Sequence, residues 1–160
     1  MENTAFYAYP DQATHVSDAI DHASAVYETR GLKLRPWPKM KIFGVKLDDL
    51  VRSEIDEAAF FIADITYPNP NVFYELGFAL ARGKPILPTV HTGIEKAVQR
   101  VGKIGLFDTI GWLGYTNGDQ LAESLLDWEQ HAWSSAYWKE RDYAQPLFIL
   151  DTYIKTDFRN

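Results

Sequence analysis

Apolar and polar residues follow one another along the chain in blocks that predict strands and helices in turn. Apolar residues recur at helical spacing over 14–27 and 47–57, which indicates two helices that each bury one face. Nearly unbroken apolar runs at 4–9 and 58–65 are typical of strands covered on both sides. The same patterns predict further strands at 32–34, 85–90 and 106–112, a loop at 35–44, and helices at 70–82 and 119–133.

This order of elements predicts an α/β fold: a doubly wound, flavodoxin-like, mainly parallel sheet of five strands. Residues 1–134 carry the alternating pattern, so we expect them to form one domain. The pattern weakens after Ser134, and 146–157 resembles a strand without an evident partner. We therefore expect residues 135–160 to be a C-terminal arm that serves oligomerisation or leads to a further domain.

Composition narrows the classes of partner. The 160 residues include 16 Lys and Arg against 22 Asp and Glu, a formal net charge of −6. This balance argues against DNA or RNA as the partner, because phosphate backbones need clustered basic residues. No apolar run approaches the ~20 residues of a membrane span, and no signal-peptide pattern is visible at the N-terminus. The cytoplasm is the expected location.

The residues available for metal and covalent chemistry are few. The chain has no cysteine, which removes disulfides, cysteine-ligated zinc and thiolate catalysis. The four histidines, His15, His22, His91 and His131, do not have the spacing of metal ligands. We therefore expect no metal site and no bound cofactor.

Open parallel sheets bind ligands beyond the carboxyl ends of their strands. That rule selects 7–11, 64–71, 89–91 and the loop after Trp112. Within the second segment, Asn69 followed by Pro70 has the pattern of a helix N-cap and first helical position. The helix after it therefore starts at the edge where a ligand is expected.

Glu75 is the one carboxylate or base in that helix between Val72 and Ala81. A helix that is apolar nearly all round is buried, and a buried carboxylate costs several kcal/mol unless it is paired or hydrogen-bonded. Burial raises the pKa of a carboxyl, which suits an acid or nucleophile in a dry site. The alternative is a structural ion pair with a neighbouring base: Arg52, Arg82 or Lys84. Gly77, in mid-helix, indicates close approach of the helix to the sheet or to a ligand.

Four short motifs together resemble one known group of proteins: Ala63-Asp64-Ile65-Thr66, Asn69-Pro70-Asn71-Val72, Tyr74-Glu75-Leu76-Gly77 and Lys84-Pro85-Ile86. They are similar to the signature of nucleoside 2-deoxyribosyltransferase-like proteins and of the related bacterial TIR-like nucleotide-binding proteins. The resemblance covers roughly residues 5–112, with Trp37 and Gly44 at similar spacing upstream.

The resemblance implies a site for a nucleoside or nucleotide, with Glu75 as the catalytic carboxylate that attacks the anomeric carbon. It implies substrate-binding roles for four further residues: Tyr7, Asp64, Asn69 and Asn71. His91 ends a strand at the same edge of the sheet, and this position gives it a candidate binding role. Each has a plainer alternative: core packing for Tyr7, capping of a turn for Asp64, the helix start for both asparagines, and an exposed loop for His91.

Two departures from the signature bear on the reaction. The first strand ends without the small-residue turn common in deoxyribosyltransferases, and no obvious base-reading carboxylate follows Asp64. Hydrolysis of a nucleotide such as NAD, as substrate, is therefore as plausible as deoxyribosyl transfer. A non-catalytic nucleotide sensor that signals through oligomerisation is the alternative. Crowded Trp and Tyr residues over 128–143 predict a homo-oligomer.

Overall fold

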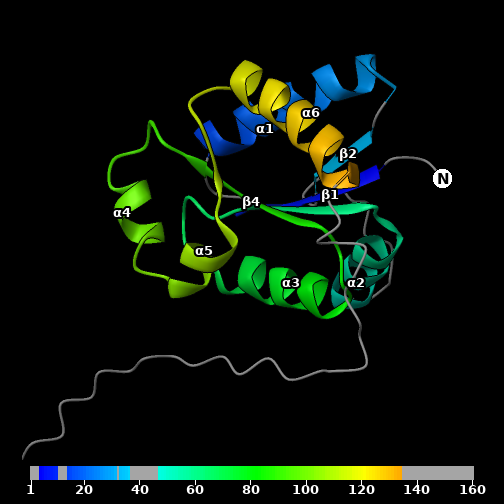
Figure 1. Cartoon of the computed structure of the whole chain (residues 1–160), viewed down its shortest axis with the longest axis horizontal. Coiled ribbons are helices and arrows are strands. Elements are labelled where there is room, and N and C mark those ends of the chain that lie inside the picture. The colour runs from blue at the N-terminus through cyan, green and yellow to red at the C-terminus, as the bar shows by residue number, and fades with distance from the viewer. Residues whose placement is uncertain (1–3, 11–13, 32, 37–46, 135–160) are drawn as a thin grey trace, which may run out of the picture.

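The computed structural model describes residues 4–10, 14–31, 33–36 and 47–134. These residues form a parallel sheet with helices on both faces (Figure 1). The strands are β1 (Thr4–Ala8), β2 (Lys33–Pro36), β3 (Phe60–Asp64), β4 (Ile86–His91) and β5 (Leu113–Tyr115). The helices are α1 (Thr14–Thr29), α2 (Leu47–Glu57), α3 (Pro70–Ala81), α4 (Ala97–Val101), α5 (Gly105–Ile110) and α6 (Gly118–Ser134).

The strand order is β2-β1-β3-β4-β5, and all four pairings are parallel. This confirms the predicted α/β fold with a five-stranded, doubly wound sheet. The strand β3 is central, and its five residues are all buried, as its unbroken apolar run predicted. Its C-terminal residue, Asp64, pairs in register with Thr89 of β4, so the two strands end at the same edge of the sheet.

Two hydrophobic clusters fill the space between the sheet and its helices. One lies against α1 and α6 and contains Phe60 and Ile62. The other lies against α2, α3, α4 and α5 and contains Phe61 and Ala63. Figure 1 shows α1 and α6 on one side of the sheet and α2, α3 and α5 on the other. Because side chains alternate along a strand, Asp64 belongs to the α1 and α6 side.

The strand predicted at 106–112 is wrong. Residues Gly105–Ile110 form the short helix α5, and the fifth strand is Leu113–Tyr115. Gly111 separates the two with a backbone φ of 70°, in the left-handed region that favours glycine. A short apolar run is compatible with a strand or with a buried helix, and here Phe107 is buried by the α2 to α5 cluster.

The other predicted elements agree with the observed ones to within a few residues, with one shift at β2, whereas the helix α4 was not predicted. The edge strand β2 includes Arg35 and Pro36, which the sequence placed in a loop; proline is tolerated there because an edge strand need not donate every N–H. The rest of that loop and the predicted arm at 135–160 lie outside the described residues.

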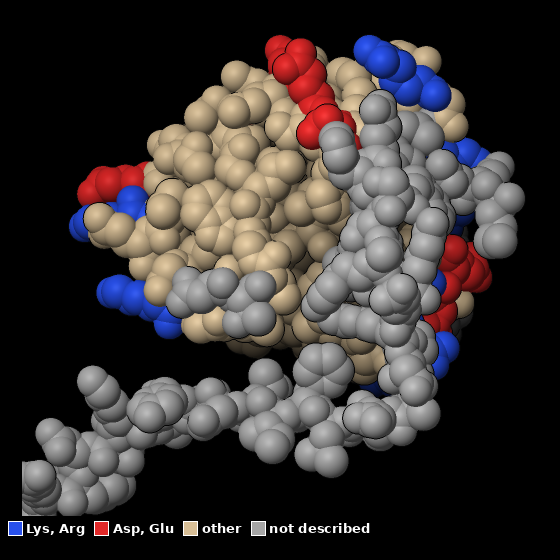
Figure 2. Space-filling model, in the orientation of Figure 1, with Lys and Arg blue, Asp and Glu red and all other residues tan. Residues whose placement is uncertain are grey.

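On the face shown in Figure 2, the described Lys and Arg side chains lie around the rim rather than over the middle. No helix in the described part of the chain is long and apolar enough to cross a membrane.

Candidate functional site

The helix α3 starts as its sequence predicted. The Asn69 side chain caps it, because its Oδ1 accepts hydrogen bonds from the backbone N–H of Asn71 at 2.9 Å and of Val72 at 3.3 Å. Pro70 occupies the first helical position. The cap fixes where the helix begins after β3, and this places Glu75 in the second turn on the buried face.

Glu75 is buried, with 8% of its surface exposed. Its Oε2 atom has no hydrogen-bond partner, and no ion pair to Glu75 is found among the described residues. The three bases that could have paired with it are bonded elsewhere: Arg52 to Asp48 and Tyr74, Arg82 to Asp56, and Lys84 to the carbonyls of Asp56 and Ala58. The structural ion pair that the sequence allowed is therefore absent from the described residues.

The surroundings of Glu75 favour its neutral form. Burial, and to a smaller extent the negative charge of Asp48 at the start of α2, raise the pKa of the Glu75 carboxyl to about 7. A carboxyl that titrates near neutrality is present both as an acid and as a carboxylate at pH 7. Groups of this kind are a feature of catalytic sites.

Asp64, the other carboxylate of the predicted site, is fully buried but has hydrogen bonds at both oxygens. Its Oδ1 accepts the backbone N–H of Thr66 at 3.0 Å. Its Oδ2 accepts the hydroxyl groups of Tyr115 at 2.7 Å and Thr89 at 3.2 Å. The Tyr7 hydroxyl lies 2.7 Å from that of Thr89. This strand-end network, Tyr7, Asp64, Thr66, Thr89 and Tyr115, joins the ends of β1, β3, β4 and β5.

Burial also governs the ionisation of the strand-end network. It raises the pKa of Asp64 to about 6, although the hydrogen bonds from Tyr115, Thr66 and Thr89 act in the opposite direction. The pKa of Tyr7 and that of Tyr115 are both raised, chiefly by burial. Both hydroxyls therefore keep their protons, and the hydroxyl of Tyr115 donates to Asp64.

The predicted site residues do not all lie together. Tyr7 and Asp64 belong to the strand-end network on the α1 and α6 side, whereas Glu75 faces the cluster on the other side of the sheet. Asn69 caps α3, and Asn71 is exposed in the first turn of that helix. His91 ends β4, and its backbone N–H donates to the Thr66 hydroxyl at 2.7 Å.

The residues that complete this arrangement were not singled out by the sequence. Thr89 is a hydroxyl residue inside an apolar strand, and that polar interruption is a signal that could have identified it. Tyr115 lies in the loop region selected after Trp112, but nothing in its sequence distinguishes it from a core tyrosine. Arg100 of α4 also reaches this edge, where it donates to the Thr66 carbonyl at 3.4 Å and lies over the Tyr67 ring.

Potential metal ligands are scattered. In the described residues, no group of three or more His, Asp or Glu side chains is placed to hold a metal ion.

Comparison with solved structures finds the same fold in two kinds of protein. A CMP N-glycosidase from Clostridium botulinum, BcmB, is 19% identical over 76% of this chain and 97% of its own, with a TM-score of 0.55. The TIR domain of the Toll-related receptor TRR-2 from Hydra magnipapillata is 12% identical over 82% of this chain and 98% of its own, with a TM-score of 0.60.

A third similar structure contains the TIR domains of the activated Roq1 resistosome, which recognises the pathogen effector XopQ. It is 13% identical over 82% of this chain and 81% of its own, with a TM-score of 0.51. No protein-family description matches the chain, and no curated protein is similar to it in sequence. At these identities the likeness establishes the fold, and it agrees with the resemblance of the sequence to nucleoside 2-deoxyribosyltransferase-like and TIR-like proteins.

Proposed function

We propose that this protein cleaves the N-glycosidic bond of a nucleoside or an NAD-type nucleotide and that Glu75 is its catalytic carboxylate. One observation carries the proposal: a buried carboxyl without a hydrogen-bond partner at Oε2, on a capped helix that starts at the carboxyl edge of the sheet. Such a group costs several kcal/mol when ionised. Its retention is explained if the substrate supplies the compensating interaction.

The proposed reaction follows from the chemistry of the sugar. As the bond between the anomeric carbon and the base nitrogen breaks, its electron pair leaves with the base and positive charge develops at the carbon. The Glu75 carboxylate stabilises that charge and forms a glycosyl ester. Water then adds its oxygen to the anomeric carbon as the ester bond breaks, Glu75 is released as the carboxylate, and the proton that the water loses goes to the departed base or to solvent. A second base in place of water gives deoxyribosyl transfer.

The other substrate-binding roles are part of the same proposal. Asn71 is exposed in the first turn of α3, where its side-chain amide and the positive end of the helix dipole favour a phosphate. Asn69 holds that turn in place through its cap. We assign Asp64 and Tyr7 positioning roles, since their polar atoms are already bonded inside the protein.

The test is incubation with a panel of nucleosides, nucleotides and NAD, followed by chromatographic detection of free base. We expect release of base from at least one member, and loss of release in Glu75→Gln. Glu123→Gln, an exposed glutamate on α6 across the sheet, is the matched control and should retain activity. Undiminished release by Glu75→Gln would refute the assignment of the catalytic residue.

A second candidate function is nucleotide sensing through assembly. It is favoured by the likeness to TIR domains, one set of which belongs to an assembled resistosome. In that case the protein binds a nucleotide, forms a homo-oligomer and releases no base. Light scattering with and without NAD distinguishes the two functions, because a sensor would change its mass while the chromatogram stays unchanged.

A further inference from the structure

The two faces of the sheet differ in charge. The helices α1 and α6 pack side by side on one face, and neither contains a Lys or Arg residue. Like charges three or four positions apart on a helix repel one another, so rows of carboxylates are unfavourable for the protein alone. The exposed carboxylates of these helices form two such rows, which together we call the acidic face: Asp18, Asp21 and Glu28 on α1, and Asp119, Glu123 and Asp127 on α6.

The carboxylates on the other side of the sheet are arranged differently. Three carboxylates of α2 form ion pairs with arginine: Asp48 with Arg52, Glu54 with Arg35, and Asp56 with Arg82. These pairs neutralise the charge of α2 within the fold. The acidic face has no arginine or lysine on its own helices, and it therefore presents a continuous negative surface that attracts a positively charged partner.

A positive surface of the same protein lies around α4, at the border of the molecule (Figure 1). Lys96 precedes this helix, Arg100 is within it and Lys103 follows it; we call these three residues the basic edge. Lys96 lies 3.5 Å from Glu95, and no ion pair to Arg100 or Lys103 is found in the part of the chain that the structure describes. Val98, between them, has 43% of its surface exposed. An apolar side chain surrounded by positive groups has the composition of a protein interface.

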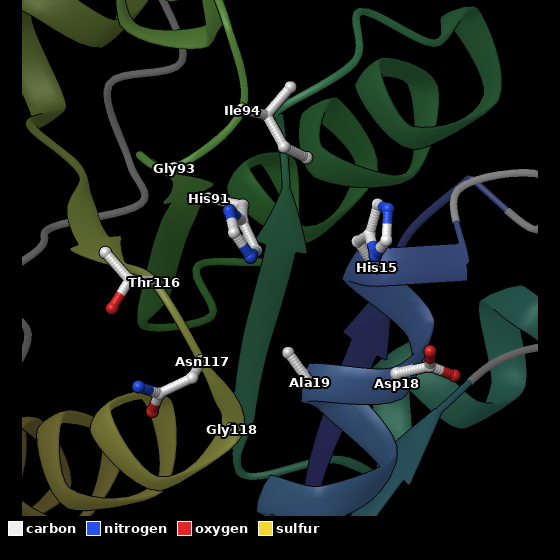
Figure 3. A pocket seen from close by; sticks show the side chains of 9 residues that line it. All are labelled: His15, Asp18, Ala19, His91, Gly93, Ile94, Thr116, Asn117 and Gly118. Atoms are coloured by element: carbon white, nitrogen blue, oxygen red, sulfur yellow. The ribbon is translucent and has the colours of Figure 1, made fainter.

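The acidic face is hollowed where α1 and α6 begin. Figure 3 shows a pocket there, with His15 and Asp18 of α1 on one side and Asn117, from the turn before α6, on the other. Its volume is about 470 Å³, and none of its lining residues is Lys or Arg. The aliphatic side chains of Ala19 and Ile94 can cover the stem of a lysine while the Asp18 carboxylate meets its ammonium group. The pocket therefore suits a basic side chain of a partner.

The acidic face and the basic edge of one molecule belong to different sides of the sheet. Ala97 and Val101 of α4 pack into the cluster with α2 and α3, whereas α1 and α6 cover the other cluster. The partner of the acidic face therefore comes from outside the molecule. A second acidic face is excluded, because carboxylates would then oppose carboxylates. The basic edge of a second copy supplies the complementary charge.

We propose that copies of this protein associate head to tail, with the acidic face of one copy binding the basic edge of the next. Such a contact leaves one surface of each kind free at the two ends, so it continues into a chain or closes into a ring. The contact needs neither a nucleotide nor Glu75, and it goes beyond the proposed reaction.

The size of the acidic face sets the expected strength. Its two helices, 16 and 17 residues long, cover roughly 25 Å by 20 Å, about 500 Å² on each partner. A total of about 1,000 Å² is at the lower limit for a specific interface. We therefore expect association that is weak and that salt weakens further, because the attraction is between exposed charges.

The experiment is sedimentation velocity of the whole protein, without nucleotide, over a series of concentrations. We expect the average mass to rise above that of the monomer as concentration increases, and association to weaken at least about tenfold between roughly 50 mM and 300 mM salt. Lys96→Gln with Lys103→Gln neutralises the basic edge, and Glu28→Gln with Glu123→Gln neutralises part of the acidic face. Each double variant alone should associate at least about fivefold more weakly than the wild type.

An equimolar mixture of the two double variants identifies the head-to-tail contact. One variant keeps the acidic face and the other keeps the basic edge, so the mixture should associate more strongly than either variant alone. A contact between two identical surfaces is not restored by such mixing.

Two controls separate this proposal from a general effect of charge and from the proposed reaction. Asp49→Asn with Glu57→Gln removes the same charge from α2, and Glu75→Gln removes the proposed catalytic carboxylate; both should associate as the wild type does. Circular dichroism checks that each variant is folded, and absence of base release leaves this test unaffected. The proposal is overturned if the protein stays monomeric throughout, if the α2 control weakens association as much as the acidic-face variant, or if the mixture fails to associate.

Discussion

Two buried carboxyl groups, Asp64 and Glu75, lie eleven positions apart in sequence, at the end of β3 and in the second turn of α3. Asp64 accepts hydrogen bonds from Thr66, Tyr115 and Thr89 and has none of its surface exposed. The Oε2 atom of Glu75 has no hydrogen-bond partner. Burial raises the pKa of both carboxyls, but only Asp64 has hydrogen-bond partners within the protein at both of its oxygens. The difference supports the proposal that Glu75 serves a ligand, whereas the polar atoms of Asp64 are already bonded within the fold.

The largest expected effect tests Glu75. Glu75→Gln should lower the rate of base release by about 1,000-fold or more, because the amide keeps the shape and loses the nucleophile. The free energy of unfolding at pH 7 should not fall. Initial rates and urea denaturation on the same preparation check both statements. A large loss of stability in this variant would show that Glu75, like Asp64, stabilises the fold, and it would contradict the contrast between the two carboxyls.

Asp64→Ala should act mainly on the fold. It leaves the Thr66 N–H and the Tyr115 and Thr89 hydroxyls without their acceptor, at a cost on the order of 4 kcal/mol of unfolding free energy. Asp64→Asn, which retains one acceptor oxygen and the shape, should lose less. Urea denaturation compares the three proteins. Equal stability of all three would show that the strand-end network contributes little.

A pH series sharpens the comparison further. A carboxyl whose pKa is raised on folding stabilises the protein most below its unfolded pKa, and this stabilisation is lost as pH rises through the folded value. For Glu75 the window runs from 4.5 to about 7. Glu75→Gln should therefore gain stability relative to wild type over this window, by up to about 3 kcal/mol. Denaturation at pH 4.5, 6 and 8 measures the trend, and a constant difference between the two proteins would contradict it.

The smallest expected effect concerns Gly77, two residues beyond Glu75. From Gly77 the sequence predicted that α3 approaches the sheet closely. This prediction is wrong, because residue 77 is exposed and an added Cβ would meet nothing within 4 Å. Gly77→Ala should stabilise the protein by about 1 kcal/mol, the ordinary gain in helix propensity. Thermal denaturation detects this change. If activity falls in a stabilised Gly77→Ala, a ligand must approach the helix at this residue.

The elements that the sequence predicted well are those with strong local signals. The strand β3 has an unbroken apolar run, and α3 combines Asn69, Pro70 and a nearly apolar face, so both were placed within two residues. The region from 105 to 115 was misjudged because one short apolar run could serve a helix or a strand. Gly111, which divides it, acts through a backbone angle that composition does not disclose.

The candidate site was predicted in part for the same reason. A single carboxylate in an apolar helix is a local signal, and it identified Glu75 as buried. Two of the hydrogen-bonding partners of Asp64, Thr89 and Tyr115, come from positions 25 and 51 residues further along the chain, so no local pattern could reveal that they meet Asp64. The sheet separates Glu75 from Tyr7, Asp64 and His91. Which face of the sheet each strand-end side chain occupies depends on the alternation of side chains along its strand, and the sequence does not give the register that decides this.

The strand-end network also has a kinetic consequence. Its contacts join Tyr7 to Thr89 and Asp64 to Tyr115 across 82 and 51 residues of sequence. Contacts between such distant residues require large loops to close, and domains dominated by them fold slowly. We expect the network to form after the rate-limiting step of folding, so that its loss accelerates unfolding while refolding is little changed. Its hydrogen bonds would then govern how long each molecule remains folded once it has formed.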